Sequence, residues 1–512
     1  MVSVKKTFHP AVLPGKGAGL LFGSFLFLMV LLAGCFESEQ INQPPPAEVT
    51  LSYVGFSQND FFVEEAASAQ LSLYGQYSDG SVEEITSGVT WSSSNETIAS
   101  VDASGILTGH LIGSGTITAS YQSFTATLSF EVYPKPPEPV SIGNLTVIPV
   151  SPVTTQSFGT VDFSVNIPVS PVSIGVVLIG TNHDFKFIEH KSILLGDGGN
   201  IRGPDGNPIT ALAFNQIDLY GTGEADYGDN LLNYQAAALY FPNDGTVASL
   251  PSGTYTFPVG SADPVYGFLR QDVVRPYVYY KVTPLPAVVP HLNVNLWVVT
   301  GINGLTTALA AENDPEIAGM VAFLRNIYET VLGITLNITY RIVPDSAFSI
   351  IGTEAEHFQL LSDHPNPAGT DAINLFIISA FDPAYLETGV VGISSGIPGP
   401  FGVQGTIVSG VIGVYQYDGV GDELGHIMSH ELGHFLGLWH TSQPDAYDDI
   451  IGHDPISDTA ACTNTHLTPS KNFNNCPDKA NLMFPFLGFS TSPGLSGNQK
   501  NALKASPAIH TN

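Results

Sequence analysis

The sequence predicts a multidomain protein in which N-terminal β-sandwich domains are followed by a C-terminal α+β domain. The chain has 512 residues, and one domain per ~150 residues gives about three or four domains. Glycine (52) and proline (37) are abundant and only 12% of residues are charged, which is typical of a β-rich secreted chain with many turns. Short strand-like runs dominate up to residue 287, and a long helical pattern follows at 315–332.

The charge balance limits the partners. The chain carries 16 Lys+Arg against 46 Asp+Glu, a formal net charge of -30. Such an acidic surface repels phosphate groups, which argues against nucleic acid and anionic lipid head groups as partners. It suits an extracytoplasmic protein, and no feature of the sequence indicates an oligomeric state.

Residues 1–34 have the pattern of an export signal, in which lysines precede an apolar run at 20–32. That run is shorter than a typical membrane span. It ends in Leu-Ala-Gly-Cys at 32–35, which resembles a bacterial lipobox. The resemblance implies a lipoprotein signal peptide, with Cys35 as the lipidated first residue of the mature chain. An ordinary cleaved signal and an uncleaved anchor are the alternatives.

Phe36, not Asp, follows this cysteine, and by the same resemblance the lipoprotein goes to the outer membrane of a two-membrane bacterium. We therefore expect contact with the membrane through the lipid anchor only. Residues 35–46 are polar and rich in proline, which predicts a tether between the lipid and the first domain.

Residues 47–133 are short alternating runs with turns at regular spacing, which predicts strands. An Asp-Gly pair at 79–80 lies between two such runs and is a hairpin signal. The runs 89–95, 98–102 and 105–109 resemble the bacterial group 2 immunoglobulin-like module. That resemblance implies a β-sandwich that serves as a spacer or adhesive module. Another small sandwich is the alternative.

Residues 134–139 form a proline-rich segment that predicts a stiff linker. Residues 140–287 are again β-rich, with an alternating run at 161–165 and a continuous apolar run at 176–179. This β-rich domain resembles no family, so its role is unknown from sequence.

The pattern changes near residue 288. A strand pattern at 291–299 is followed by the helical pattern at 315–332 and then by two further strand patterns. Residues 288–512 are therefore predicted to form the α+β domain, and a last strand pattern lies at 406–415.

The most specific motif of this domain is H-E-x-x-H-x-x-G-x-x-H. On a helix, His430 and His434 lie four residues apart, so both imidazoles project from one face and can share one metal ion. Gly437 lets the chain leave the helix through a backbone conformation that other residues resist, and the turn can bring back His440 as a third ligand. Three imidazoles leave one zinc position open, where water has a pKa of roughly 7 and Glu431 can take its proton.

This motif is identified as the metzincin signature of zinc peptidases. The resemblance implies a methionine turn beneath the metal, which Met483 in Asn-Leu-Met-Phe-Pro supplies. It also implies that the strand at 406–415 is an edge strand that binds extended substrate. Pro485 stands where some metzincins carry a tyrosine beside zinc, so no tyrosine is assigned to the metal. His426 lies four residues before the first ligand and is interpreted as a supporting or packing residue.

Two features between the zinc motif and Met483 bear on the subfamily. Cys462 and Cys476 are close in sequence, which in an exported chain predicts a disulfide. The segment Asp-Pro-Ile-Ser-Asp-Thr resembles that of pappalysin-like metzincins, in which aspartates bind calcium, so Asp454 and Asp458 are candidate Ca²⁺ ligands. An acidic solvated loop is the alternative. The form of the methionine turn looks more like that of matrixins, so both subfamilies stay open.

The sequence as a whole predicts a zinc metalloendopeptidase, anchored to the bacterial cell surface, that hydrolyses peptide bonds of extracellular proteins. Zn²⁺ is the expected cofactor, a protein or peptide is the substrate, and Glu431 is the general base. The competing interpretation is a surface adhesion or glycan-binding lipoprotein with a catalytically inactive metzincin fold. A metal-dependent hydrolase that acts on a non-peptide bond is a third interpretation. The intact glutamate favours catalysis.

Overall fold

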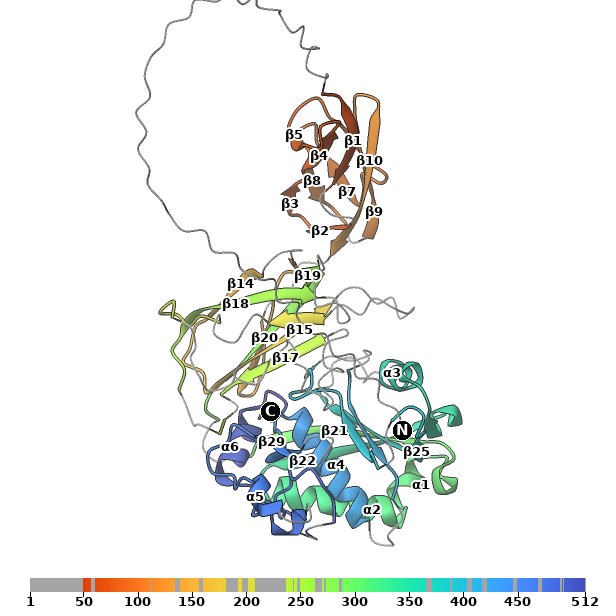
Figure 1. Ribbon diagram of the computed structural model, residues 1–512, viewed down its shortest axis with the longest axis vertical. Helices are drawn as coiled ribbons and strands as arrows, with labels where there is room; N and C mark the ends of the chain where they lie inside the picture. The colour runs from red at the N-terminus through yellow and green to blue at the C-terminus, as the bar shows by residue number, and fades with distance from the viewer. Residues whose placement is uncertain are drawn as a thin grey trace, which may run out of the picture. The chain divides into compact units, whose positions relative to one another are not determined.

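A computed structural model describes the chain over residues 49–56, 60–111, 113–133, 139–155, 160–180, 192–195, 201–207, 236–242, 244–245, 249–262, 269–270, 273–284, 288–364, 371–386, 389–402, 408–416, 421–444, 449–467, 472–488, 490 and 492–511. The predicted export signal, Cys35 and the tether lie outside these residues. Within them, no helix combines the length and apolar character needed to cross a bilayer. The described chain is multidomain and rich in strands (Figure 1).

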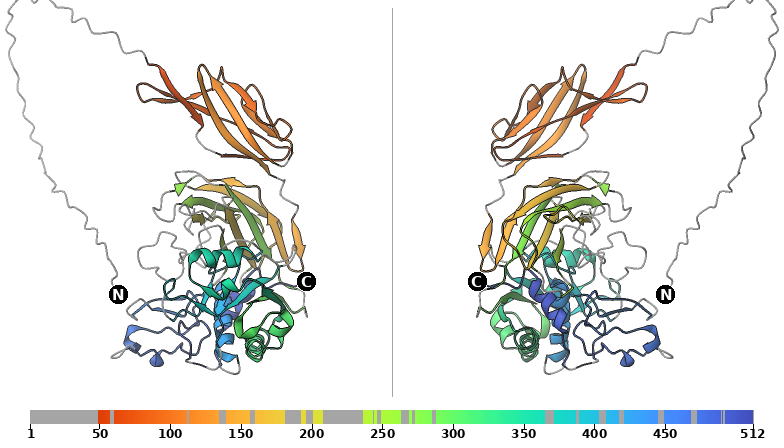
Figure 2. Two further views of the ribbon diagram at one scale, coloured as in Figure 1. Left: turned by 90° about the vertical axis from the view of Figure 1, so that its right-hand side faces the viewer. Right: turned by 90° about the vertical axis from the view of Figure 1, so that its left-hand side faces the viewer.

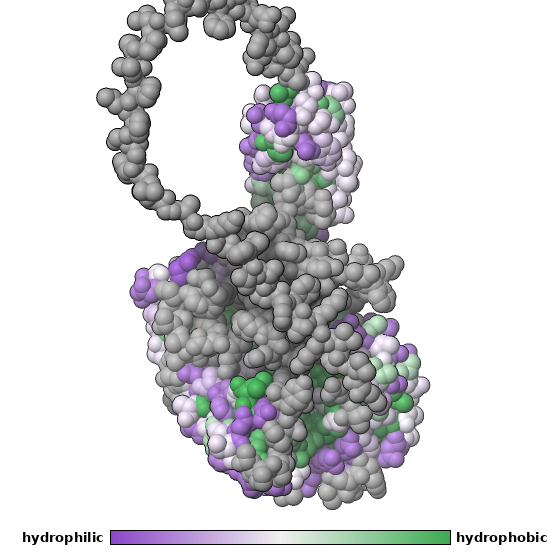
Figure 3. Space-filling view, in the orientation of Figure 1, coloured by the Kyte–Doolittle hydropathy of each residue, from purple (hydrophilic) through white to green (hydrophobic). Residues whose placement is uncertain are grey.

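Residues 51–133 form three small sheets around buried apolar side chains. The sheets are β1 (Leu51–Phe56), β4 (Leu73–Tyr77) and β5 (Val82–Ile85); β2 (Asp60–Glu64), β10 (Phe124–Tyr133), β9 (Gly113–Tyr121) and β6 (Thr90–Ser93); and β3 (Ser68–Gln70), β8 (Ile106–Gly109) and β7 (Ala99–Val101). Alternate residues of the β9–β10 hairpin, such as Ile117 and Leu128, are buried, which is the expected pattern for strands with one wet face. The coloured surface of this part mixes hydrophilic residues with scattered apolar ones (Figure 3).

The Asp-Gly hairpin signal is confirmed. Strands β4 and β5 pair antiparallel across it, and Gly80 has φ +86°, a conformation that glycine adopts without a steric penalty. The turn therefore forms where the sequence predicted it.

The described residues within 140–284 form a second sandwich (Figure 2). One sheet contains β11 (Val140–Ile142), β12 (Leu145–Pro149), β13 (Val153–Thr154), β20 (Val273–Lys281), β15 (Ser173–Gly180) and β17 (Ala236–Phe241). The other contains β14 (Val161–Ile167), β18 (Gly253–Ala262), β16 (Ser192–Leu195) and β19 (Leu269–Arg270). We call this the middle sandwich.

Strand β15 is buried on both faces. Val176 and Leu178 face the core shared by the two sheets, whereas Val177 belongs to the core of residues 288–511. This double burial explains the continuous apolar run at 176–179, because a strand with one wet face would alternate.

Residues 288–511 contain a five-stranded sheet in the order β22 (Thr335–Val343), β21 (His291–Val299), β24 (Ile373–Ile378), β27 (Val411–Val414) and β26 (Gly392–Ser394). The first four strands run parallel and β26 is antiparallel to β27. Two further strand pairs are β23 (Ile350–Ile351) with β25 (Ala380–Phe381), and β28 (Ser442–Pro444) with β29 (Ile450–His453).

The helices of this part are α1 (Ala308–Glu312), α2 (Pro315–Arg325), α3 (Glu354–Ser362), α4 (Asp422–Phe435), α5 (Asn464–Leu467) and α6 (Gly497–Ala505). Helix α2 begins where Asp314 accepts hydrogen bonds from the backbone N–H groups of Glu316 and Ile317, which is the standard role of an N-cap aspartate. The rest of the predicted helix continues as a π-helix, Asn326–Val331. Helices α2 and α4 pack side by side, and Gly425 of α4 has room only for hydrogen beside Phe323.

The prediction that 406–415 is an edge strand is wrong. The strand there, β27, lies between β24 and β26, so the edge of the sheet is β26. Strand β26 lies at the start of a glycine-rich run, 392–400, and its three residues carry too little periodicity to reveal pairing. A mixed sheet with helices is not specific to metzincins, so the metzincin assignment of residues 288–511 stays a prediction.

Candidate metal centre

Helix α4 carries two of the three motif histidines. It begins after Gly421, with Asp422 and Glu423 in its first turn, where acidic side chains interact favourably with the helix dipole. His430 and His434 are buried, each with 6% of its surface exposed. Their rings lie 4.7 Å apart by centroid, so the spacing of four places both on one face as predicted.

The third histidine returns through a glycine turn. Gly437 has φ +100°, and its N–H donates to the carbonyl of His434 at 2.7 Å. The chain then reverses so that Nε2 of His440 lies 3.1 Å from Nε2 of His430 and 3.1 Å from Nε2 of His434. The structure therefore brings together the three predicted ligands.

The opposite ring nitrogens determine what these atoms can do. Nδ1 of His430 lies 2.7 Å from the carbonyl oxygen of Leu482, and Nδ1 of His434 lies 2.7 Å from that of Leu438. Nδ1 of His440 lies 2.9 Å from the side-chain oxygen of Gln443. Each Nδ1 therefore carries the proton and donates it, which leaves three Nε2 lone pairs that face one another.

Three converging lone pairs cannot hydrogen-bond to one another, but they fit a cation. Zinc–nitrogen bonds of about 2.0–2.1 Å place tetrahedral ligand atoms about 3.3 Å apart, close to the 3.1 Å separations of the Nε2 atoms. The donor set and its geometry therefore fit a zinc ion with three protein ligands, which leaves a fourth position for water or substrate.

Burial keeps these imidazoles neutral. It lowers the pKa of His430 to about 3, helped by the neighbouring His440, and it lowers the pKa of His434 well below its usual range. Burial also lowers the pKa of His440, against the bond to Gln443 that raises it. Since metals bind the neutral ring, the site is ready to bind a cation at neutral pH.

Glu431 lies beside the edge strand β26. A Cβ on Gly392 would come 2.6 Å from its Cγ and 2.7 Å from its Oε1, so a larger residue there would displace this side chain. Burial raises the pKa of Glu431 to about 8, and a hydrogen bond from the backbone of Ser394 opposes that shift. A divalent cation next to the carboxylate would favour its charged form. Both residues belong to the glycine-rich run 392–400, which is distant in sequence from the motif.

Met483 lies under the ligand helix. It is fully buried, and its sulfur would be 2.6 Å from a Cβ on Gly433. Its N–H donates to the side chain of Asn481, and its carbonyl accepts the N–H of Thr441. The turn that holds this methionine thus also orients His430, through the carbonyl of Leu482.

The predicted disulfide between Cys462 and Cys476 is present. Asp478 follows it, is 3% exposed, and accepts hydrogen bonds from the hydroxyls of Thr441 at 2.7 Å and Ser442 at 2.6 Å. It ties the segment just after His440 to the approach to the methionine turn. Sequence reasoning missed this residue, although its place directly after Cys-Pro was a usable signal.

The two calcium candidates have different environments. Both oxygens of Asp458 accept hydrogen bonds at the start of α6, from the hydroxyl of Ser496 and the backbone N–H of Asn498. Asp454 is 9% exposed and uses one oxygen for the hydroxyl of Thr459. Its Oδ2 is buried with no hydrogen-bond partner among the described residues, and the same holds for Oδ1 of Asp478.

Such buried, unpartnered carboxylate oxygens are costly without a cation. Burial raises the pKa of Asp454 to about 7, and the charges of Asp478 and Asp458 raise it further. Asp454 and Asp478 therefore each have a buried oxygen that a cation would satisfy, whereas both oxygens of Asp458 already accept hydrogen bonds at α6.

A second cluster of possible metal ligands contains His291, Asp371 and His510. Oδ2 of Asp371 lies 2.6 Å from Nε2 of His510 and 3.9 Å from Nε2 of His291. One proton shared by the closer pair accounts for this contact. The cluster fixes the end of the chain against β21, where His510 and His291 also pair through their backbones.

Comparisons with known proteins concern the N-terminal part most clearly. The model of the bacterial Ig-like domain (group 2) family matches residues 52–132. Ice-binding protein 1 of Shewanella frigidimarina (strain NCIMB 400) is 30% identical over 122 residues, which are 23% of this chain and 14% of that protein. The chain thus covers a small part of the length of this relative.

The similar solved structures match with low TM-scores. Domains 4 and 5 of the S-layer protein SbsC match with 19% identity, a TM-score of 0.15, and coverage of 17% of this chain and 53% of that one. An intimin mutant of EHEC O157:H7 matches with 20% identity, a TM-score of 0.12, and coverage of 21% and 52%.

Residues 52–132 are thus a bacterial group 2 Ig-like domain, which confirms that part of the sequence analysis and supports a cell-surface location. The lipid anchor remains a prediction.

Proposed function

We propose that this protein is a zinc endopeptidase of the metzincin type that acts on proteins outside the cell. The observation that supports it is that Nε2 of His440 lies 3.1 Å from Nε2 of both His430 and His434, while each Nδ1 donates its proton to an oxygen. This arrangement suits a three-histidine catalytic zinc site with an open position. We also propose Cys35 as the lipid attachment point and Ca²⁺ as the cation at Asp454 and Asp478.

In this proposal the metal and Glu431 divide the work. A zinc ion supplies polarisation of the scissile carbonyl and acidification of a water molecule. Glu431 accepts the proton of the attacking water and passes it to the leaving amine. The N–H of Ser394 holds the carboxylate in place, and the imidazoles stay oriented through their Nδ1 bonds.

Strand β26 supplies a binding mode for the substrate. Among the described residues it pairs with β27 on one side only, so its other edge can pair with an extended peptide, as in β-augmentation. Gly392 and Ser394 of the same strand contact Glu431. A peptide bound along this edge would therefore pass close to the general base.

The test is cleavage of a fluorogenic casein by the mature chain, residues 35–512, loaded with one equivalent of zinc. Glu431→Ala should keep its zinc and lose at least about 1,000-fold in kcat/KM, because the water then lacks its base. Glu423→Ala, an exposed glutamate on the same helix, is the matched control and should cleave as wild type does.

The Ig-like family match supports the second candidate, a surface adhesion or glycan-binding protein. Equal inactivity of wild type and Glu431→Ala on casein, gelatin and a mixed peptide library, with zinc bound in both, would favour that function over a peptidase.

A further inference from the structure

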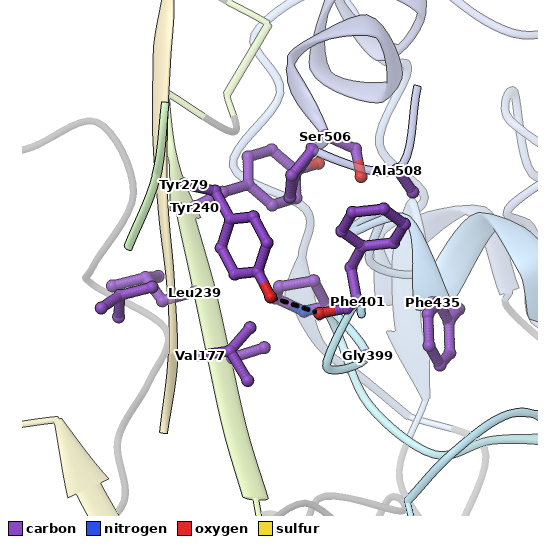
Figure 4. A pocket seen from close by; sticks show the side chains of 14 residues that line it. Val177, Leu239, Tyr240, Tyr279, Gly399, Phe401, Phe435, Ser506 and Ala508 are labelled. Atoms are coloured by element: carbon purple, nitrogen blue, oxygen red, sulfur yellow. Dashed lines mark hydrogen bonds between the residues drawn. The ribbon is translucent and has the colours of Figure 1, made fainter. Parts of the chain in front are cut away.

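The middle sandwich supplies none of the site residues described above, yet it contacts the C-terminal end of α4. Strand β17 brings Tyr240 against this end, and the ring is 1% exposed. The hydroxyl of Tyr240 donates to the carbonyl of Leu436 and lies 3.2 Å from the carbonyl of Ala502 in α6. Figure 4 shows Tyr240 beside Tyr279 and Phe401 at this contact.

The Tyr240 contact falls on the turn that leads to the third ligand. Leu436 is the C-cap of α4, and Gly437 follows it with φ +100°. A Cβ on Gly437 would lie 2.4 Å from the hydroxyl oxygen of Tyr240. The motif glycine is thus required twice, for its backbone conformation and for the space that Tyr240 occupies.

Other buried contacts hold the middle sandwich in place. The ammonium of Lys281 donates to the carbonyls of Lys504, Ser506 and Ile509 at the end of α6. The hydroxyl of Tyr279 donates to the carbonyl of Phe401 at 3.1 Å. A buried ammonium bonded to three carbonyls would be costly to expose unpaired in a separated interface.

Packing along this contact is close. Val177 and Tyr279 belong to the same apolar core as the sheet and helices of 288–511. The cavity between them and Phe435, drawn in Figure 4, holds about 10 Å³, which is about the space of one water molecule. The contact therefore resembles the interior of a domain more than a flexible junction.

We propose that the middle sandwich is part of the catalytic unit and that Tyr240 is a positioning residue for the third zinc ligand. Its hydroxyl holds the carbonyl of Leu436, and its ring limits the path of the Leu436–Gly437 turn that delivers His440. This rests on the proposed function only in taking the bound metal to be zinc.

The experiment compares zinc affinity in the full mature chain, by competition with a chromogenic chelator at pH 7.5. Tyr240→Phe keeps the ring and removes the hydroxyl. It should weaken zinc binding about 10-fold, which is the lower end of the loss of metal affinity that follows removal of a group supporting a metal ligand. Tyr255→Phe is the matched control. That tyrosine is also in the middle sandwich and 1% exposed, but it donates to the carbonyl of Pro251, so its loss should leave zinc affinity within twofold of wild type.

A cobalt-substituted sample provides a second readout, since its visible spectrum reports the ligand geometry. Tyr240→Phe should alter this spectrum and Tyr255→Phe should not. Equal zinc affinity and identical cobalt spectra for the two variants would overturn the proposal, whatever their melting temperatures. Because both readouts use metal alone, they remain decisive even if the chain cleaves no protein, which would count against the proposed function only.

Discussion

Replacing Gly437 by alanine tests the close contact at the turn before the third ligand. A left-handed backbone costs a residue with a Cβ about 1–2 kcal/mol, and Gly437 has φ +100°. The new Cβ would also lie 2.4 Å from the hydroxyl oxygen of Tyr240 and 2.6 Å from its Cε1, and such overpacking typically costs about 1–3 kcal/mol. The expected loss in the free energy of unfolding is therefore about 2–5 kcal/mol.

Gly333→Ala is the matched control for this measurement. Gly333 has φ +78° in the same part of the chain, and its Cβ would meet nothing within 4 Å. It should cost only the backbone part, about 1–2 kcal/mol, and both variants gain equally from the stiffer unfolded chain.

The assay is urea unfolding of the metal-free mature chain, followed by zinc titration. Gly437→Ala should be less stable than Gly333→Ala and should also bind zinc more weakly, because the turn delivers His440. Equal unfolding free energies together with wild-type zinc affinity for Gly437→Ala would refute the proposed crowding of the turn by Tyr240.

Three further predictions concern the surroundings of the site. Calcium should raise the melting temperature of the zinc-loaded chain. Asp454→Asn and Asp478→Asn should each abolish this rise, whereas Asp458→Asn should keep it because that carboxylate caps α6. A rise lost only in Asp458→Asn would reverse the assignment. Asp458→Ala, which removes both accepted hydrogen bonds, should itself cost about 1 kcal/mol in urea unfolding, and no measurable cost would contradict that role. The hydrogen bond from His510 holds the pKa of Asp371 at about 2. The stabilising effect of the charged carboxylate is therefore present above pH 4 and is lost as the pH falls through 2. Between pH 5 and pH 2, wild type should lose about 1–2 kcal/mol more free energy of unfolding than Asp371→Asn, after allowance for partial solvent screening.

The zinc ligands could be predicted because their chemistry depends on local spacing. Two histidines four residues apart share a helix face whatever surrounds the helix, and a glycine at 437 marks the turn that returns the third. The predicted ligands His430, His434 and His440 are the ones that converge. The disulfide followed from two cysteines close together in an exported chain.

The supporting residues could not be predicted, because they come from distant segments. Tyr240 precedes the carbonyl that it contacts by 196 positions, and no periodicity in β17 points to that carbonyl. Asp478 lies beyond the disulfide, so the calcium assignment paired Asp454 with the nearer Asp458. Strand β26 was missed because three residues carry too weak a pattern to show which strand lies at the edge of the sheet.

The most direct test of the central claim is X-ray absorption at the zinc edge of the mature chain loaded with one equivalent of metal. The proposed site predicts three imidazole nitrogens and one water oxygen at about 2.0–2.1 Å, and His440→Ala should reduce the imidazole count to two. Failure to retain one equivalent of zinc, or a spectrum unchanged by His440→Ala, would contradict the account.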